Sequence, residues 1–144
     1  MTNAEIARLS FWKNLKNRLE YLGNPFTIQE SDKQWAVVNR TDTNFWKKGY
    51  FIDYLHQKGI IRMGLYIPND IELYNRLYKK KEVINNNLIF RTVIWLDKGP
   101  KSNNIRWIKR EIAIINYSKE DAINEVIKTM KNIVDVLNPY LPKN

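Results

Sequence analysis

The amino-acid sequence predicts an α+β protein with the element order α-β-β-β-α-β-β-α, in which a mostly antiparallel five-stranded sheet carries its helices on one face. Three segments predict helices because their apolar residues recur at three- and four-residue steps. The segments between them alternate apolar and polar residues or are rich in β-branched and aromatic residues, which is typical of strands. A helix with a single apolar stripe buries that stripe against one face of a sheet. The sequence therefore predicts two layers, one of helices and one of strands.

The first helix is predicted over residues 3–22. Thr2 and Glu5 have the spacing of a capping box at its start, and Gly23 followed by Pro25 is a stop signal at its end. One apolar stripe runs along it and consists of Ile6, Leu9, Trp12, Leu15, Leu19 and Leu22. This stripe is expected to pack on the core.

Three strands are predicted next, over residues 34–41, 49–56 and 59–67. The first is rich in β-forming residues, and the other two alternate between two sets of side chains, so each has one face for the core. Residues 57–59 form a short hairpin turn between the second and third strands. A longer turn at 42–49 joins the first strand to the second.

A second helix is predicted over residues 70–85. Asn69 and Glu72 have capping-box spacing, and the run of asparagines at 85–87 is expected to end the helix. Its apolar side is formed by Leu73, Tyr74, Leu77, Tyr78 and Ile84.

Two more strands, at 88–97 and 104–116, flank a loop with turn-forming residues and are expected to pair as a hairpin. The last helix has the clearest pattern. Ser118 is its predicted cap with Asp121 three residues on, and Asn138 followed by Pro139 ends it. One face of this helix carries Ala122, Ile123, Val126, Ile127, Met130, Ile133, Val134 and Leu137.

The chain has 144 residues, about the length of one domain, so a single domain over residues 1–144 is expected. It contains no cysteine, which excludes disulfide bonds and thiolate chemistry. No apolar run approaches the roughly 20 residues that a membrane span needs. The N-terminal segment lacks the apolar core and cleavage site of a secretory signal. We therefore expect a cytoplasmic protein that makes no membrane contact.

Positive charge is concentrated in the middle of the chain. Residues 56–110 hold 12 Lys/Arg against 4 Asp/Glu, whereas the whole chain has a net charge of +9. Clustered cations attract phosphate chains, so DNA or RNA is the expected partner of this basic segment. The alternative partner is the acidic surface of another protein, and the same charge is also compatible with a role in solubility alone.

Three groups of residues are candidates for nucleic-acid binding. The first group, in the predicted turn at 42–49, consists of Phe45, Trp46, Lys47 and Lys48. The second, at the end of the second predicted helix, consists of Lys79, Lys80 and Lys81. The third, on the last two predicted strands, consists of Arg91, Arg106 and Arg110. Exposed aromatics stack on unpaired bases, while lysine and arginine hold phosphates. Arg106 and Arg110 have the same strand parity and are expected on one face.

Each group also has a purely structural interpretation. Aromatic residues in a turn can fold over the end of the core, and lysines at a helix end interact favourably with the helix dipole. The strand arginines can form cross-strand salt bridges, for instance with Glu111 or Asp97.

The sequence contains no catalytic signature, so no cofactor, no metal site and no catalytic residue are predicted. His56 is the only histidine and has no visible orienting partner. A restriction-type nuclease would need an acidic residue followed by a Glu-x-Lys pair, whereas Lys109 precedes Glu111 here. A metal-dependent nuclease using Asp53, Asp97 and Glu111 is kept as a third hypothesis, after nucleic-acid binding and protein interaction.

The element order, together with a set of structural residues, resembles the domain-of-unknown-function family DUF4268. The matching residues are Phe11, Trp12, Leu19, Gly23, Pro25, Trp35, Leu65, Tyr66, Ile67, Asp70 and Phe90. The resemblance covers roughly the whole chain. It implies a prokaryotic protein of unknown function, from a family in which many members lie C-terminal to restriction-nuclease-like domains. It implies a supporting role near DNA-processing or defence systems and carries over no catalytic residues.

Overall fold

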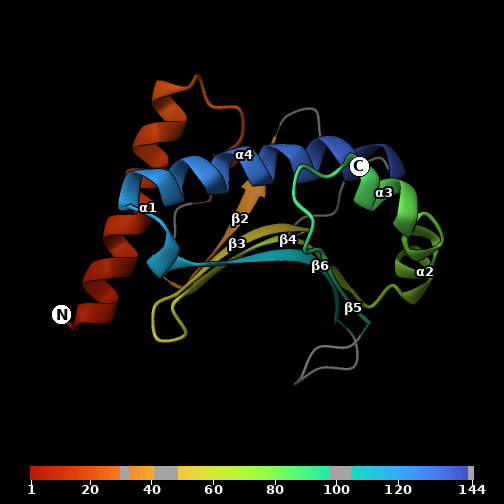
Figure 1. Ribbon diagram of the computed structural model, residues 1–144, viewed down its shortest axis with the longest axis horizontal. Coiled ribbons are helices and arrows are strands. Elements are labelled where there is room, and N and C mark those ends of the chain that lie inside the picture. Colours follow the sequence, from red (N-terminus) through yellow and green to blue (C-terminus); the bar gives the residue numbers. More distant parts are fainter. Residues whose placement is uncertain (30–32, 41–48, 98–104, 143–144) are drawn as a thin grey trace.

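The computed structural model describes residues 1–29, 33–40, 49–97 and 105–142. Its elements form one sheet with helices packed on it (Figure 1). The sheet has the order β1-β2-β3-β4-β6-β5, and every neighbouring pair in it is antiparallel. The helices are α1 (Asn3–Tyr21), α2 (Ile71–Lys79), α3 (Lys81–Asn87) and α4 (Lys119–Leu137). The strands are β1 (Thr27–Ile28), β2 (Trp35–Asn39), β3 (Tyr50–Leu55), β4 (Ile60–Pro68), β5 (Ile94–Leu96) and β6 (Ile105–Ala113). Short 3-10 turns, Ile114–Asn116 and Asn138–Tyr140, flank α4.

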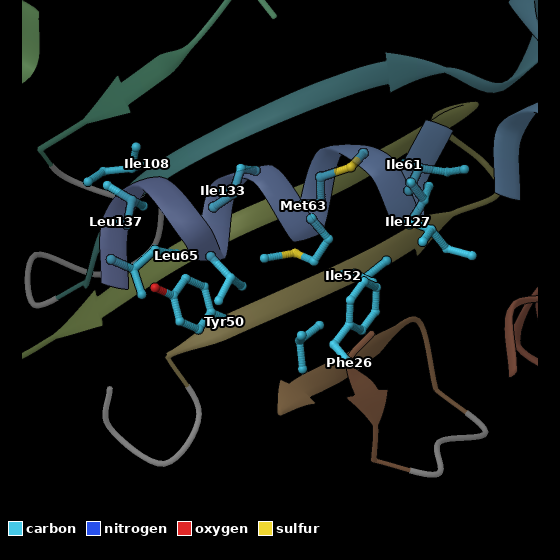
Figure 2. Close-up of a cluster of buried hydrophobic side chains, with 14 of the residues drawn as sticks. Phe26, Tyr50, Ile52, Ile61, Met63, Leu65, Ile108, Ile127, Ile133 and Leu137 are labelled. Carbon is cyan, nitrogen blue, oxygen red and sulfur yellow. The ribbon is translucent and has the colours of Figure 1, made fainter. Parts of the chain in front are cut away.

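The core lies between α4 and one face of the sheet (Figure 2). On β3 and β4, the cross-strand partners Ile52 and Met63 point into it, and neither is accessible to solvent. α4 contributes Ile127, Ile133 and Leu137 to it (Figure 2). Because side chains alternate along a strand, this register also fixes which residues face the other way.

Both long helices begin as their sequences predict. The backbone N–H of Glu5 donates to the Thr2 hydroxyl at 3.1 Å and completes a capping box, and the N–H of Asp121 donates to the Ser118 hydroxyl at 3.1 Å. Gly23, at φ 80, follows the end of α1, where a left-handed residue favours glycine. α1 packs against α4 and β1, and its Phe11 and Leu15 join the same core.

The sheet has six strands, so the predicted number of five is wrong. The additional strand, β1, pairs with β2 through Thr27 and Ile28 only. A two-residue strand is too short to show any periodicity. It forms because the chain, after leaving α1, runs back along the edge of β2 and buries Phe26 in the core (Figure 2).

The predicted second helix is divided at Lys80 into α2 and α3. The cap of α2 is Asp70, which accepts a hydrogen bond from the N–H of Leu73 at 3.0 Å, and not the predicted Asn69. Asn69 has φ 54, outside the helical range. The asparagines at 85–87 form the last turn of α3, which ends at Asn87 as expected, and the preceding Ile84 is buried.

The predicted strand 88–97 is also shorter than expected, since β5 covers only Ile94–Leu96. The preceding residues pack on α4 instead of joining the sheet. Leu88 and Phe90 are buried, and the backbone N–H of Ile89 donates to the side-chain oxygen of Asn132 in α4 at 2.9 Å. The expected hairpin with the last strand is confirmed by the pairing of β5 with β6.

Among the described residues, no helix has both the length and the apolar character needed to cross a membrane.

Candidate functional site

The sheet face turned away from α4, here called the outer face, carries aromatic and charged side chains. The register places Trp35 opposite Asp53, Asp53 opposite Arg62, and Arg62 opposite Glu111 in one row across four strands. Further along the same face, Tyr66 lies opposite Trp107. Alternation along the strands therefore places these charged and aromatic groups on the face opposite the core residues.

A hollow of about 270 Å³ opens on the outer face, and we call it the aromatic hollow. Among the described residues its walls include Trp35, Phe51, Tyr66 and Trp107, and the ion pair of Asp53 and Arg62 also lines it. The rings of Tyr66 and Trp107 are tilted at a centroid distance of 5.7 Å, and Phe51 meets both edge-on. Trp35 is the most accessible of the four, with 39% of its surface exposed.

The polar part of this hollow is a buried ion pair. Arg62 donates to Oδ2 of Asp53 from Nε at 3.1 Å and from Nη2 at 2.6 Å. Asp53 is only 5% exposed, and its burial raises the pKa of the carboxyl group, an effect that Arg62 partly offsets. Within the described residues, Oδ1 of Asp53 accepts no hydrogen bond, so one acceptor is left for a ligand.

Cations flank Trp107 within the same face. The Arg62 guanidinium lies 5.9 Å from the centroid of the indole ring, and the Lys109 ammonium lies 5.6 Å from it. Lys109 is buried and pairs with Glu111 at 3.0 Å. Burial also raises the pKa of the Tyr66 hydroxyl above its ordinary value of 10.0. Like any tyrosine hydroxyl that is protonated at neutral pH, it can donate a hydrogen bond.

The two strand arginines predicted to bind nucleic acid do share one face, but it is the face that packs against the helices. Arg106 lies opposite Ile67 of the core, is buried, and donates to Asp97 at 3.0 Å. Arg110 lies opposite Met63 and donates to Glu125 of α4 at 2.6 Å. The salt-bridge alternative is therefore what the structure shows for Arg106 and Asp97.

The remaining predicted residues lie apart from the aromatic hollow. Lys79, Lys80 and Lys81 occupy the junction of α2 and α3, where Lys81 lies 4.9 Å from the Tyr78 ring centroid. Arg91 is exposed and precedes β5, so it is not on a strand as expected. Phe45, Trp46, Lys47 and Lys48 lie outside the described residues.

The acidic residues considered for a metal site are separated in space or already paired. Asp97 pairs with Arg106 on the core side, whereas Asp53 and Glu111 lie on the outer face with Arg62 between them. Across the described part of the chain, no group of three or more His, Asp or Glu side chains is placed to hold a metal ion.

Sequence reasoning did not identify Trp35, Tyr66 and Trp107 as site residues. A signal for Tyr66 was present, because it alternates with the core residues of its strand and shares parity with Arg62. What the sequence could not supply was the register that brings residues from β2, β3, β4 and β6 into one row.

Among solved structures, the crystal structure of YbjN from E. coli, described as "a putative transcription regulator", is similar to this chain, with a TM-score of 0.54. The sequences are 17% identical, and the alignment covers 89% of each chain, so the likeness concerns the fold alone. No curated protein matches the sequence. The family model described as "Domain of unknown function (DUF4268)" matches residues 7–141. The resemblance noted in the sequence is thereby confirmed, and the chain belongs to the DUF4268 family.

Proposed function

We propose that this protein binds single-stranded nucleic acid through the aromatic hollow on the outer face of its sheet. The observation that carries the proposal is that solvent-accessible aromatic rings lie beside two ion-paired cations, Arg62 and Lys109, on one sheet face. Trp35 is exposed, and Tyr66 and Trp107 are half-buried. Unpaired bases stack on aromatic residues of this kind on the surfaces of sheets, and neighbouring cations hold the phosphates.

The ion pair of Asp53 and Arg62 supports the same function. The free Oδ1 of Asp53 is an acceptor, and the guanidinium of Arg62 keeps N–H groups beyond the two that Asp53 uses. A base that stacks in the hollow can direct its hydrogen-bonding edge at this pair. In a duplex that edge is already engaged, so single strands are the favoured form.

The charge of the whole chain supports binding to a polyanion. The chain carries 24 Lys/Arg against 15 Asp/Glu. Neutralising phosphates releases counterions, so the affinity must fall as salt is added. If about 5 phosphates are neutralised, the log–log slope of affinity against salt is about −3 to −4 for a single strand, and we expect dissociation constants in the micromolar range or weaker.

Titration of the protein with a fluorescent single-stranded oligonucleotide at low salt tests this proposal. We expect quenching of tryptophan emission on binding and weaker binding of the matching duplex. Trp35→Ala removes one stacking surface and is expected to weaken binding by about 5- to 150-fold, because a stacked base contributes roughly 1–3 kcal/mol. Tyr78→Ala is the matched control, since Tyr78 is also exposed but lies on α2.

Two results would contradict the proposal. One is that no oligonucleotide binds at low salt, and the other is that Trp35→Ala and Tyr78→Ala bind as tightly as the wild type.

The lysines at the α2–α3 junction give a second, purely electrostatic contact to test in the same experiment. Replacing Lys79, Lys80 and Lys81 together with Gln is expected to flatten the salt slope if this surface also touches phosphate, without changing the preference for single strands. Lys128→Gln, on the exposed side of α4, is expected to leave the slope unchanged.

A protein partner is the second candidate function. It is favoured by apolar side chains that the structure leaves in solvent at the N-terminal half of α1 and after β6. Ile6 is 51% exposed and Ile115 is 91% exposed. Absence of oligonucleotide binding would make this the first candidate.

A further inference from the structure

A second hollow adjoins the aromatic hollow where β3 turns into β4, and we call it the basic hollow. It encloses about 340 Å³ and is lined by Arg8 of α1 and by His56 and Lys58 of the turn, among other residues. Figure 1 shows the start of α1 beside this turn. The two hollows share Gln34 and Arg62, so a ligand can extend from one into the other.

The basic hollow has an excess of positive charge. Its described lining contains Arg8, Lys58 and Arg62 and no aspartate or glutamate. The charge of Arg62 is balanced by Asp53. For Arg8 and Lys58, by contrast, no ion pair or hydrogen bond is formed with any residue that the structure describes, so within those residues the two cations have no counterion.

Arg8 gives the more specific indication. Its Nε is inaccessible to solvent and, among the residues described, has no hydrogen-bond acceptor. Buried donors are normally paired, and an unpaired donor at the edge of a hollow is a group that an incoming acceptor can satisfy. The planar guanidinium presents its N–H groups in a fork that matches the oxygens of phosphate.

We propose that the basic hollow binds a phosphate group through Arg8 and Lys58. In the complex with nucleic acid, this is the phosphate next to the base held in the aromatic hollow, a placement that rests on the function proposed above. The shared position of Arg62 between the hollows then lets one guanidinium lie close to both the base and its phosphate. Recognition of a base and its phosphate in adjoining hollows distinguishes this arrangement from a diffuse basic surface.

The first test uses inorganic phosphate alone. A ligand that binds only the folded state raises the melting temperature. Phosphate is expected to raise the Tm of the wild type above that in chloride of equal ionic strength, and Arg8→Gln with Lys58→Gln is expected to lose this effect. The charge-matched control is Lys128→Gln with Lys131→Gln, since both of these lysines are exposed on α4, on the other side of the sheet. Circular dichroism of each variant checks that it is folded, and Lys58→Gln alone provides a variant confined to the turn.

The second test compares a short single-stranded oligonucleotide with its uncharged methylphosphonate analogue. The wild type is expected to prefer the charged strand by about 10-fold or more. Arg8→Gln with Lys58→Gln is expected to reduce this preference and to flatten the salt slope by about 1 to 2, whereas Trp35→Ala is expected to weaken both strands equally.

The outcomes separate the two proposals. If the strands bind but the Arg8 and Lys58 variant behaves like the Lys128 and Lys131 control, the phosphate site is overturned and the proposed function stands. If phosphate raises the Tm through Arg8 but no strand binds, the phosphate site stands and the proposed function is overturned. If neither phosphate nor a strand has an effect, both are overturned.

Discussion

Gly64 lies at the middle of the sheet, where β4 and β6 approach each other too closely for a side chain. A Cβ atom at this position would lie 2.1 Å from the backbone oxygen of Ile108 and 2.7 Å from the Cα of Lys109. Both contacts are with backbone, so relief requires the strands to separate. A single glycine in a strand therefore marks a close backbone approach.

Gly64→Ala is predicted to destabilise the protein by about 2–3 kcal/mol, the upper part of the range for overpacking. Urea unfolding followed by tryptophan fluorescence measures the change. Gly59→Asn is the comparison, because Gly59 has a left-handed φ of 66 with open space around its Cβ position, and asparagine tolerates that conformation. Equal stability of Gly64→Ala and the wild type would show that the two strands can move apart at little cost.

Asp53 is predicted to make stability depend on pH. Its burial raises the pKa above the ordinary value of 3.8, so the folded state binds this proton more readily than the unfolded state does. The contribution of this protonation to the free energy of unfolding is fully present below about pH 3.8, and it is lost as the pH rises through the raised pKa of the folded state. Free energies of unfolding of the wild type and Asp53→Asn, measured from pH 3.5 to 7, are expected to show the wild type losing stability relative to the variant. A relative gain with pH would mean that the pairing with Arg62 outweighs burial.

At the scale of elements, α4 supplies the largest helical contribution to the core. Its buried face includes Met130 and Ile133, which are 0% and 2% exposed. The same face was predicted from the three- and four-residue spacing of its apolar residues. In an amphipathic helix of 19 residues this spacing repeats over several turns and defines one buried side.

Met130→Ala and Ile133→Ala are each predicted to lower the free energy of unfolding by about 2–4 kcal/mol, since each removes buried atoms and leaves a cavity. Denaturant unfolding measures the change. Lys131→Ala, on the exposed side of the same helix, is expected to change stability by less than about 0.5 kcal/mol. Costs below that value for Met130 and Ile133 would be incompatible with the packing of this face.

The segment before β5 shows where prediction of elements fails. Residues 88–97 have the composition of a strand, yet the first three of them pack on the helix side, because Asn132 of α4 accepts a hydrogen bond from the backbone of Ile89 and the core accepts Leu88 and Phe90. β-propensity describes a fit to a half-buried surface, and here a helix supplies that surface in place of a neighbouring strand.

At the scale of the whole molecule, we predict that residues 1–144 unfold as one cooperative domain. Far-ultraviolet circular dichroism follows the helices, and fluorescence follows tryptophans on different elements, among them Trp12 on α1 and Trp107 on β6. The two signals are expected to give coincident transitions in urea, as two-state unfolding requires. Separate midpoints would indicate more than one folding unit.

The sequence by itself determined the α+β class, the two long helices with their caps, the central strands and the face of α4 that is buried. These follow from periodicity and capping, which act over a few neighbouring residues.

The tertiary structure decided the sixth strand, the division of the second helix and the arrangement of the site. Strand parity placed Arg106 and Arg110 together, but only the register and the packing of α4 turned them toward the core. The same register gathered Trp35, Asp53, Arg62 and Trp107 on the outer face from four strands. Pairing between distant segments depends on how all elements fit together, and no local pattern in the chain encodes it.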